Sequence, residues 1–108
     1  MTIKLKLRQE DGSVKTYERP DTTVLEEEKF FELQDKARKA AIDEKKSRIE
    51  IQNMQLQFIV DLFKGYGDFT LEDMKLGILS KEKSKTIRGI FAQITPEDFE
   101  DDSKPKKK

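Results

Sequence analysis

Residues 2–9, TIKLKLRQ, alternate strictly between apolar and polar side chains, and this alternation constrains the fold more than any other feature of the chain. It predicts a β-strand with one buried face. An Asp-Gly pair follows at residues 11 and 12, where a tight turn needs positive φ, and a second strand-like segment returns after it. We therefore predict a β-hairpin over residues 2–18. The apolar face of its first strand consists of Ile3, Leu5 and Leu7.

A two-stranded hairpin is only marginally stable in water, so this apolar face must pack on helices or on a partner's sheet. The chain has 108 residues, of which 41% are charged and 34% hydrophobic. These proportions predict one small domain with a thin core and helices that have broad solvated faces. We expect a single domain over residues 1–99. The expected fold class is α+β, mainly α with an N-terminal β-hairpin.

Three capping boxes predict helix starts, because a hydroxyl and a carboxylate three residues apart each accept a backbone N–H at a helix N-terminus. They begin at Thr23, Ser47 and Thr70. With the apolar spacing that follows each box, and with a later segment of the same periodicity, they indicate about four helices. The predicted helices span residues 23–44, 48–64, 71–79 and 84–94. One alternative stays open, a single long helix through residues 43–50, although we favour a break near Lys45.

The stretch LFKGYGDFTLEDMKLGIL, residues 62–79, contains three of the five glycines and could be mistaken for a ligand-binding loop. It lacks the spacing of a phosphate-binding motif and the alternating oxygen ligands of a calcium loop. Gly65 and Gly67 instead predict a helix end, since glycine tolerates left-handed backbone. Phe69 and Met74 flank the cap at Thr70 as a hydrophobic staple. We interpret the stretch as a corner between two helices, with a further turn permitted by Gly77.

The end of the sequence offers little to bury. Thr95 and Pro96 predict one more short helical turn. Residues 100–108, EDDSKPKKK, form a block of acids followed by lysines, and we expect this segment to be a disordered tail. Its lysines could contact phosphate, but nearby acids oppose this and the rest of the chain has no basic stripe with interleaved aromatics.

Chemistry is limited by composition, because the chain contains no His and no Cys. The usual base near neutral pH, the commonest metal ligand and the most reactive nucleophile are therefore missing. The carboxylates lie mainly in first helical turns, on polar faces or in the tail. We expect no enzymatic activity, no catalytic or metal-binding residues and no cofactor. Lys plus Arg and Asp plus Glu both number 22, so no net charge draws the chain to nucleic acid or to a membrane.

The segment FIVDLFKGYGDFTLEDMKLGI and the later TIRGIFAQI resemble the tail assembly chaperones of long-tailed phages that infect Gram-positive bacteria. The matching positions of the first segment are Phe63, Phe69, Thr70, Asp73 and Gly77. Those of the last helix are Ile87, Ile90, Phe91 and Ile94. The resemblance covers about residues 3–94. It implies a non-enzymatic protein of the host cytoplasm that binds the tape measure protein and keeps it competent for tail tube polymerisation, and that is absent from the mature virion.

Related phages often make a frameshift-extended form that recruits the tail tube protein, and the charged tail of this chain lies where such an extension would begin. Oligomeric state stays open, and homo-oligomers are compatible with the sequence. The alternative is a small helical nucleic-acid-binding or regulatory protein. The candidate contact surface for a partner is whichever of six apolar residues proves exposed, although core packing is favoured for each alone. The six are Phe58, Phe63, Tyr66, Phe69, Met74 and Phe91.

Overall fold

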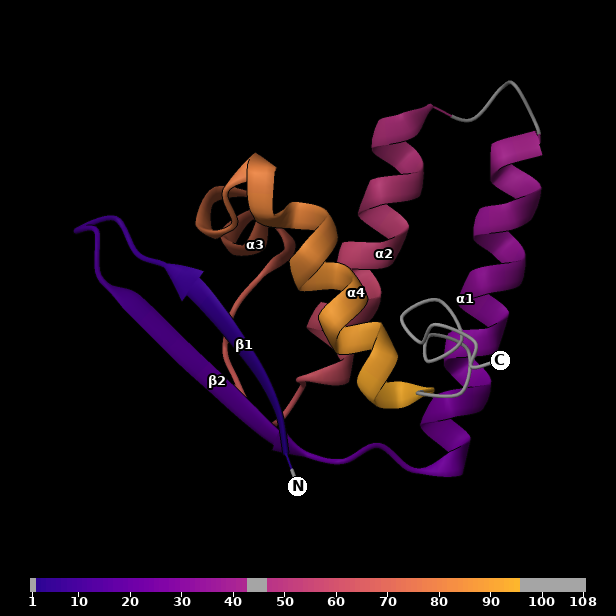
Figure 1. Cartoon of the computed structure of the whole chain (residues 1–108), viewed down its shortest axis with the longest axis horizontal. Helices are drawn as coiled ribbons and strands as arrows, with labels where there is room; N and C mark the ends of the chain where they lie inside the picture. The colour runs from indigo at the N-terminus through magenta and orange to yellow at the C-terminus, as the bar shows by residue number, and fades with distance from the viewer. Residues whose placement is uncertain (1, 43–46, 96–108) are drawn as a thin grey trace, which may run out of the picture.

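The computed structural model describes residues 2–42 and 47–95. Within them a two-stranded antiparallel hairpin precedes four α-helices, which confirms the predicted fold class (Figure 1). The strands are β1 (Thr2–Arg8) and β2 (Val14–Pro20). The helices are α1 (Val24–Ile42), α2 (Arg48–Leu62), α3 (Leu71–Gly77) and α4 (Lys83–Ile94), with a 3₁₀ turn η1 (Ser80–Glu82) before α4. The expected tail and the expected turn after Thr95 lie outside the described residues.

The hairpin turn has the geometry that its sequence predicts. Gly12 has φ 89°, and its amide donates to the Gln9 carbonyl at 2.9 Å. The Ser13 hydroxyl and amide both donate to Asp11 Oδ1, at 2.6 and 2.9 Å. These hydrogen bonds lower the pKa of the Asp11 carboxyl, and the bond from the Ser13 hydroxyl contributes most. The turn is therefore fixed locally, without help from the helices.

The second strand is longer than predicted, because it continues to Pro20 instead of ending at residue 18. Pro20 pairs with Thr2 at the end of the ladder. Proline is tolerated there because β2 lies at the sheet edge, where its missing N–H removes no bond to a further strand. The extra pairs bring Arg19 opposite Ile3, on the face of the sheet that carries Leu5 and Leu7.

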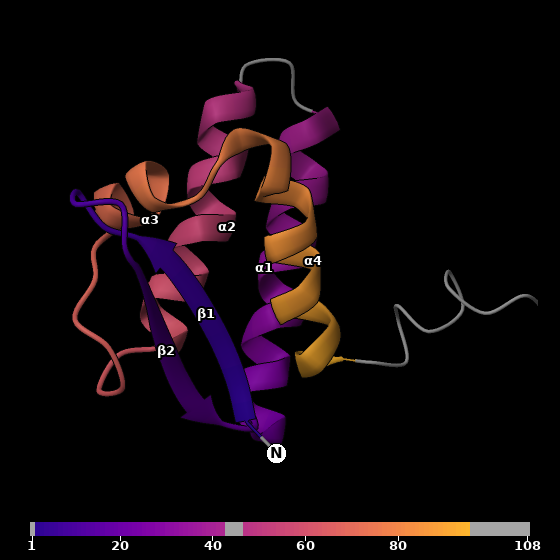
Figure 2. The ribbon, with the colours of Figure 1, turned by 60° about the vertical axis from the view of Figure 1, so that its left-hand side comes forward.

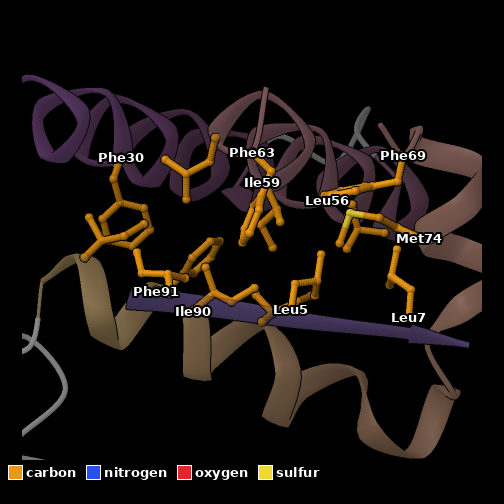
Figure 3. Close-up of a cluster of buried hydrophobic side chains, with 14 residues drawn as sticks. Leu5, Leu7, Phe30, Leu56, Ile59, Phe63, Phe69, Met74, Ile90 and Phe91 are labelled. Atoms are coloured by element: carbon orange, nitrogen blue, oxygen red, sulfur yellow. The ribbon is translucent and has the colours of Figure 1, made fainter. Parts of the chain in front are cut away.

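The apolar face of β1 was expected to pack either on helices or on a partner's sheet, and it packs on helices. Ile3, Leu5 and Leu7 are 0 to 1% exposed, and β1 contacts α3 and α4. In Figure 2 the hairpin forms a layer to one side of the helices, and α4 contacts both β1 and α1. Figure 3 shows the core between these layers. Its buried members are Ile3, Leu5, Leu7, Phe30, Leu56, Ile59, Leu62, Phe63, Phe69, Met74, Ile87, Ile90, Phe91 and Ile94.

The predicted break between the first two helices is confirmed. α1 and α2 pack side by side as separate helices, so the chain reverses direction between them (Figures 1 and 2). Ser47 caps α2: its amide donates to Glu50 Oε1 at 2.9 Å, and the Glu50 amide donates to Ser47 Oγ at 3.2 Å. Residues 43–46, where the break was placed, lie outside the described part of the chain.

The corner after α2 differs in detail from the prediction. The helix ends at Leu62 instead of residue 64: the Phe63 amide still donates to the Ile59 carbonyl at 3.1 Å, but the Lys64 amide donates to the Asp61 carbonyl. The Phe63 ring is completely buried. Gly65 has φ 90° and supplies the left-handed turn. Gly67 does not, so its expected role as a left-handed cap was wrong. A Cβ at Gly67 would approach Tyr17 Cδ1 to 2.6 Å, so this glycine makes room for the Tyr17 ring.

The next helix begins as predicted and ends earlier. The Thr70 amide donates to Asp73 Oδ2 at 3.0 Å and the Asp73 amide to Thr70 Oγ1 at 3.1 Å, a complete capping box. α3 ends at Gly77 instead of residue 79. A Cβ at Gly77 would lie 3.1 Å from the Arg8 carbonyl oxygen, so the glycine allows α3 to approach the backbone of β1. Phe69 and Met74, the predicted staple, lie at the same end of the core (Figure 3).

Candidate protein-binding surface

Four of the six candidate contact residues are buried, so they do not belong to an exposed contact surface in this folded form. Phe63 and Met74 have no exposed surface, Phe69 is 5% exposed and Phe91 is 7% exposed. Their spacing along the helices aims them into the core, which a chain with so few apolar residues needs to fill. Tyr66 is 48% exposed, and Phe58 is half-buried. Only these two therefore remain as candidates.

Phe58 takes part in an aromatic cluster that joins three helices. Its ring centroid lies 5.8 Å from that of Phe30 in α1 and 6.1 Å from that of Phe91 in α4, and the latter pair is edge to face. Phe30 and Phe91 are 4.6 Å apart (Figure 3). Such pairs stabilise by about 0.5–1.5 kcal/mol each beyond their buried area. Phe58 is thus partly structural, and it also lines a surface hollow.

Arg19 is a buried arginine whose structural role the sequence did not reveal. It is 5% exposed, and within the described part of the chain no other charged residue is buried. Its guanidinium donates to Glu26 Oε2 and Oε1 at 2.9 and 3.0 Å, to the Leu62 carbonyl at 2.6 Å and to the Pro20 carbonyl at 2.8 Å. This single side chain therefore joins β2 to the start of α1 and to the end of α2.

Glu26 completes the same junction. It accepts the Thr23 amide at 2.8 Å, and its own amide donates to Thr23 Oγ1 at 3.3 Å, so the first capping box is formed as well. Burial raises the pKa of the Glu26 carboxyl, but hydrogen bonds from Arg19 and from the Thr23 amide, with the Arg19 charge, outweigh burial and lower it. The carboxylate is thus held ionised opposite a buried cation.

Tyr66 lies over this junction. The Arg19 Cζ atom is 5.0 Å from the centroid of the Tyr66 ring, a cation–π contact. Beside it, a hollow of about 190 Å³ is lined by Glu26, Lys29, Phe58, Asp61 and Leu62. We name Tyr66, Phe58, Lys29 and Asp61 the Tyr66 surface. It combines the exposed Tyr66 ring, the half-buried Phe58 ring and charges of both signs.

A second concave region lies between the start of α2 and the elements α3, η1 and α4. Its volume is about 300 Å³, and its apolar lining consists of Ile49, Leu56, Met74 and Ile78. Lys75 and Lys83 border it, and Lys83 Nζ donates to Gln52 Oε1 at 2.6 Å. An adjoining hollow adds Arg48. We name this region the basic groove.

The described residues contain neither a candidate metal site nor a membrane-spanning helix. Among residues 2–42 and 47–95, no group of three or more acidic side chains is placed to hold a metal ion. No helix in the same residues is long and apolar enough to cross a membrane. What the surface offers is an aromatic anchor and an apolar groove with charged borders, which are features of protein recognition.

Comparison with known protein families shows which kind of protein-binding protein this chain is. A family model described as a phage tail chaperone protein matches residues 1–108, the whole chain. The chain belongs to the phage tail chaperone family. This is a family of non-catalytic assembly factors. Searches of curated proteins and of solved structures gave no match to this tail chaperone.

The residues that carried the resemblance have structural roles in this tail chaperone. Phe63 and Phe69 are core residues with ring centroids 5.7 Å apart. Thr70 and Asp73 form the cap of α3, and Gly77 allows α3 to approach β1. The matching residues thus define a helix corner, and Phe58, Asp61 and Tyr66 of the Tyr66 surface belong to the same segment.

Proposed function

We propose that this tail chaperone binds the tape measure protein of a long-tailed phage and keeps it soluble until tail tube subunits polymerise around it. The chaperone acts without catalysis in the cytoplasm of the infected bacterium and is absent from the mature virion. A frameshift-extended form recruits the tail tube protein. The whole-chain match to the tail chaperone family is the observation that carries this proposal.

The Tyr66 surface is the contact site that we propose for the tape measure protein. Tyrosine and arginine are over-represented among the residues that dominate binding energies. Here the Tyr66 ring is held by Arg19, and Arg19 is itself fixed by four hydrogen bonds. A ring that is already ordered loses little conformational entropy on binding. Apolar segments of a client can therefore pack on it at low cost.

Co-expression tests the function. The tape measure protein from the same genome is expressed alone, with the wild-type chain, or with the Tyr66→Ser variant. We expect the wild-type chain to keep the client in the soluble fraction and to co-purify with it. Truncation of Tyr66 is expected to weaken binding by about 30-fold, the effect of losing a binding hot spot of about 2 kcal/mol.

Two control variants make the result specific. Tyr66→Phe keeps the ring and is expected to bind like the wild type. Leu76→Asp changes a residue of α3 that is 74% exposed and lies outside the Tyr66 surface, and it should also leave binding unchanged. Wild-type binding by Tyr66→Ser would move the contact site elsewhere. Failure of the wild-type chain to hold the client in solution would refute the function.

A further inference from the structure

The two faces of the hairpin differ in what covers them. Ile3, Leu5 and Leu7 are buried against the helices, so the residues between them in β1 point to the opposite side. The strand register places alternate residues of β2 beside them on that side. In Figure 1 the helices lie on one side of the hairpin only. We name the other side the outer face, and its residues, all exposed, are Thr2, Lys4, Lys6, Arg8, Val14, Thr16, Glu18 and Pro20.

The outer face carries a row of cations along β1. Lys4, Lys6 and Arg8 are two residues apart, so successive charged side chains leave the strand at intervals of about 7 Å. Glu18 lies opposite Lys4, but Lys4 Nζ and Glu18 Oε2 are 3.8 Å apart and both side chains are more than half exposed. No ion pair among the described residues involves Lys6 or Arg8. The row therefore attracts a partner that carries carboxylates at a matching interval.

The neighbouring row, on β2, consists mainly of short side chains. Apart from Glu18 these are Val14, Thr16 and Pro20, and Val14 is 50% exposed. Two paired strands are about 10 Å wide, and strands of this length extend over about 20 Å. An α-helix has a similar diameter of about 10 Å and covers 20 Å with about 14 residues. One helix thus fits the outer face, with small side chains beneath it and cations along one flank.

We propose that the outer face binds an acidic α-helix of a partner protein. The helix lies along the β2 row and presents a carboxylate at every fourth residue to Lys4, Lys6 and Arg8. Residues four apart on a helix are about 6 Å apart along its axis, which is close to the interval of the cations. Arg19, which holds Tyr66, points to the inner face, so the outer face stays accessible while a client occupies the Tyr66 surface. The proposal goes beyond tape measure binding and does not depend on it.

A fluorescently labelled helical peptide tests the proposal on the purified full chain, without a client. The peptide has about 16 residues, with glutamate at every fourth position among alanine and glutamine. Fluorescence anisotropy measures its Kd, and ¹H–¹⁵N spectra of the chain locate the contact. We expect amide shifts in β1 and β2, and an affinity that falls as salt rises, because the cations are exposed to solvent. A peptide with lysine in place of glutamate should not bind.

Charge reversals on the two rows should change the affinity for the peptide in opposite directions. Lys4→Glu with Lys6→Glu is expected to weaken binding at least about tenfold, since like charges then face each other. Glu18→Lys removes the acid of the outer face and should strengthen binding, a gain that unfolding of the variant cannot produce. The matched control is Lys36→Glu with Lys39→Glu, two exposed positions of α1, which should leave the affinity unchanged.

Four results would overturn the proposal. The first is no binding of the peptide at low salt. Amide shifts confined to the helices, or equal losses in the outer-face and control variants, would show that the glutamates bind elsewhere or through net charge alone. A single-stranded oligonucleotide of equal charge that binds the outer face as tightly as the peptide would make this face a general polyanion site. If the peptide binds only after the acids of residues 97–102 are replaced by their amides, the occupant is that segment of the chain itself.

Discussion

Arg19→Met removes the junction between the hairpin and the two long helices. Methionine can fill the space of the arginine stem, so the change mainly removes the guanidinium and its four hydrogen bonds. The Leu62 carbonyl, at the end of α2, and the Glu26 carboxylate then lose their partner. Truncating one side of a buried ion pair costs about 3–5 kcal/mol. The Glu26 side chain is 28% exposed, which lets water replace part of the loss, so we expect about 2–3 kcal/mol.

Urea unfolding, followed by far-UV circular dichroism, measures this change in the free energy of unfolding. The corresponding fall in melting temperature is roughly 10–20 °C for a domain of this size. Arg38→Met is the matched control: it also removes an arginine from an ion pair, with Asp35 at 3.0 Å, but both side chains are more than 60% exposed. Its expected cost is below about 0.5 kcal/mol. A loss at Arg19 no larger than the loss at Arg38 would refute the assigned role.

Three further predictions address the caps, the corner and the junction. Thr70→Ala removes the hydroxyl that accepts the Asp73 amide, and urea unfolding should show a loss of about 1 kcal/mol with client binding intact; unchanged stability would mean that the cap contributes nothing. Gly67→Ala should destabilise the wild-type chain by about 1–3 kcal/mol, because the new Cβ collides with the Tyr17 ring. The same substitution should cost much less in a Tyr17→Ala background, and an equal loss of stability in the two backgrounds would contradict the clash. The pKa of the Glu26 carboxyl is lowered from its ordinary value of 4.5, so its ionised form stabilises the fold above that pH, and this stability is lost as pH falls through the folded value. The free energy of unfolding should therefore drop from pH 6 to pH 3, and it should drop by less in Arg19→Met. Parallel pH profiles of the two proteins would contradict this assignment.

Local signals in the sequence predicted most of the elements. The alternation of β1, the Asp-Gly turn and the capping boxes each depend on residues at most a few positions apart, so one stretch of sequence contains the whole cause. The hairpin, the helix starts at Thr70 and Ser47 and the separation of α1 from α2 are examples. Helix ends were less accurate, because burial of Phe63 and the approach of α3 to β1 depend on distant parts of the chain.

The surface was much harder to predict, for the same reason. Periodicity shows that a residue lies on an apolar helix face, but not whether another element covers that face, so Phe63, Phe69, Met74 and Phe91 were named together with Tyr66. Arg19 gave no local signal. Its partners are Glu26, seven positions away, and the Leu62 carbonyl, 43 positions away, and only the strand register and the packing of α2 bring them together.

The most direct measurement of the central claim is a pull-down of the co-expressed tape measure protein by the affinity-tagged chain, with the fraction of client in the soluble extract measured in the same samples. We expect the tape measure protein to be soluble and to co-purify with the wild-type chain and with Tyr66→Phe, and both signals to fall with Tyr66→Ser. A tape measure protein that stays insoluble with the wild-type chain, or that is soluble without ever co-purifying, would contradict the claim that this tail chaperone acts by binding it.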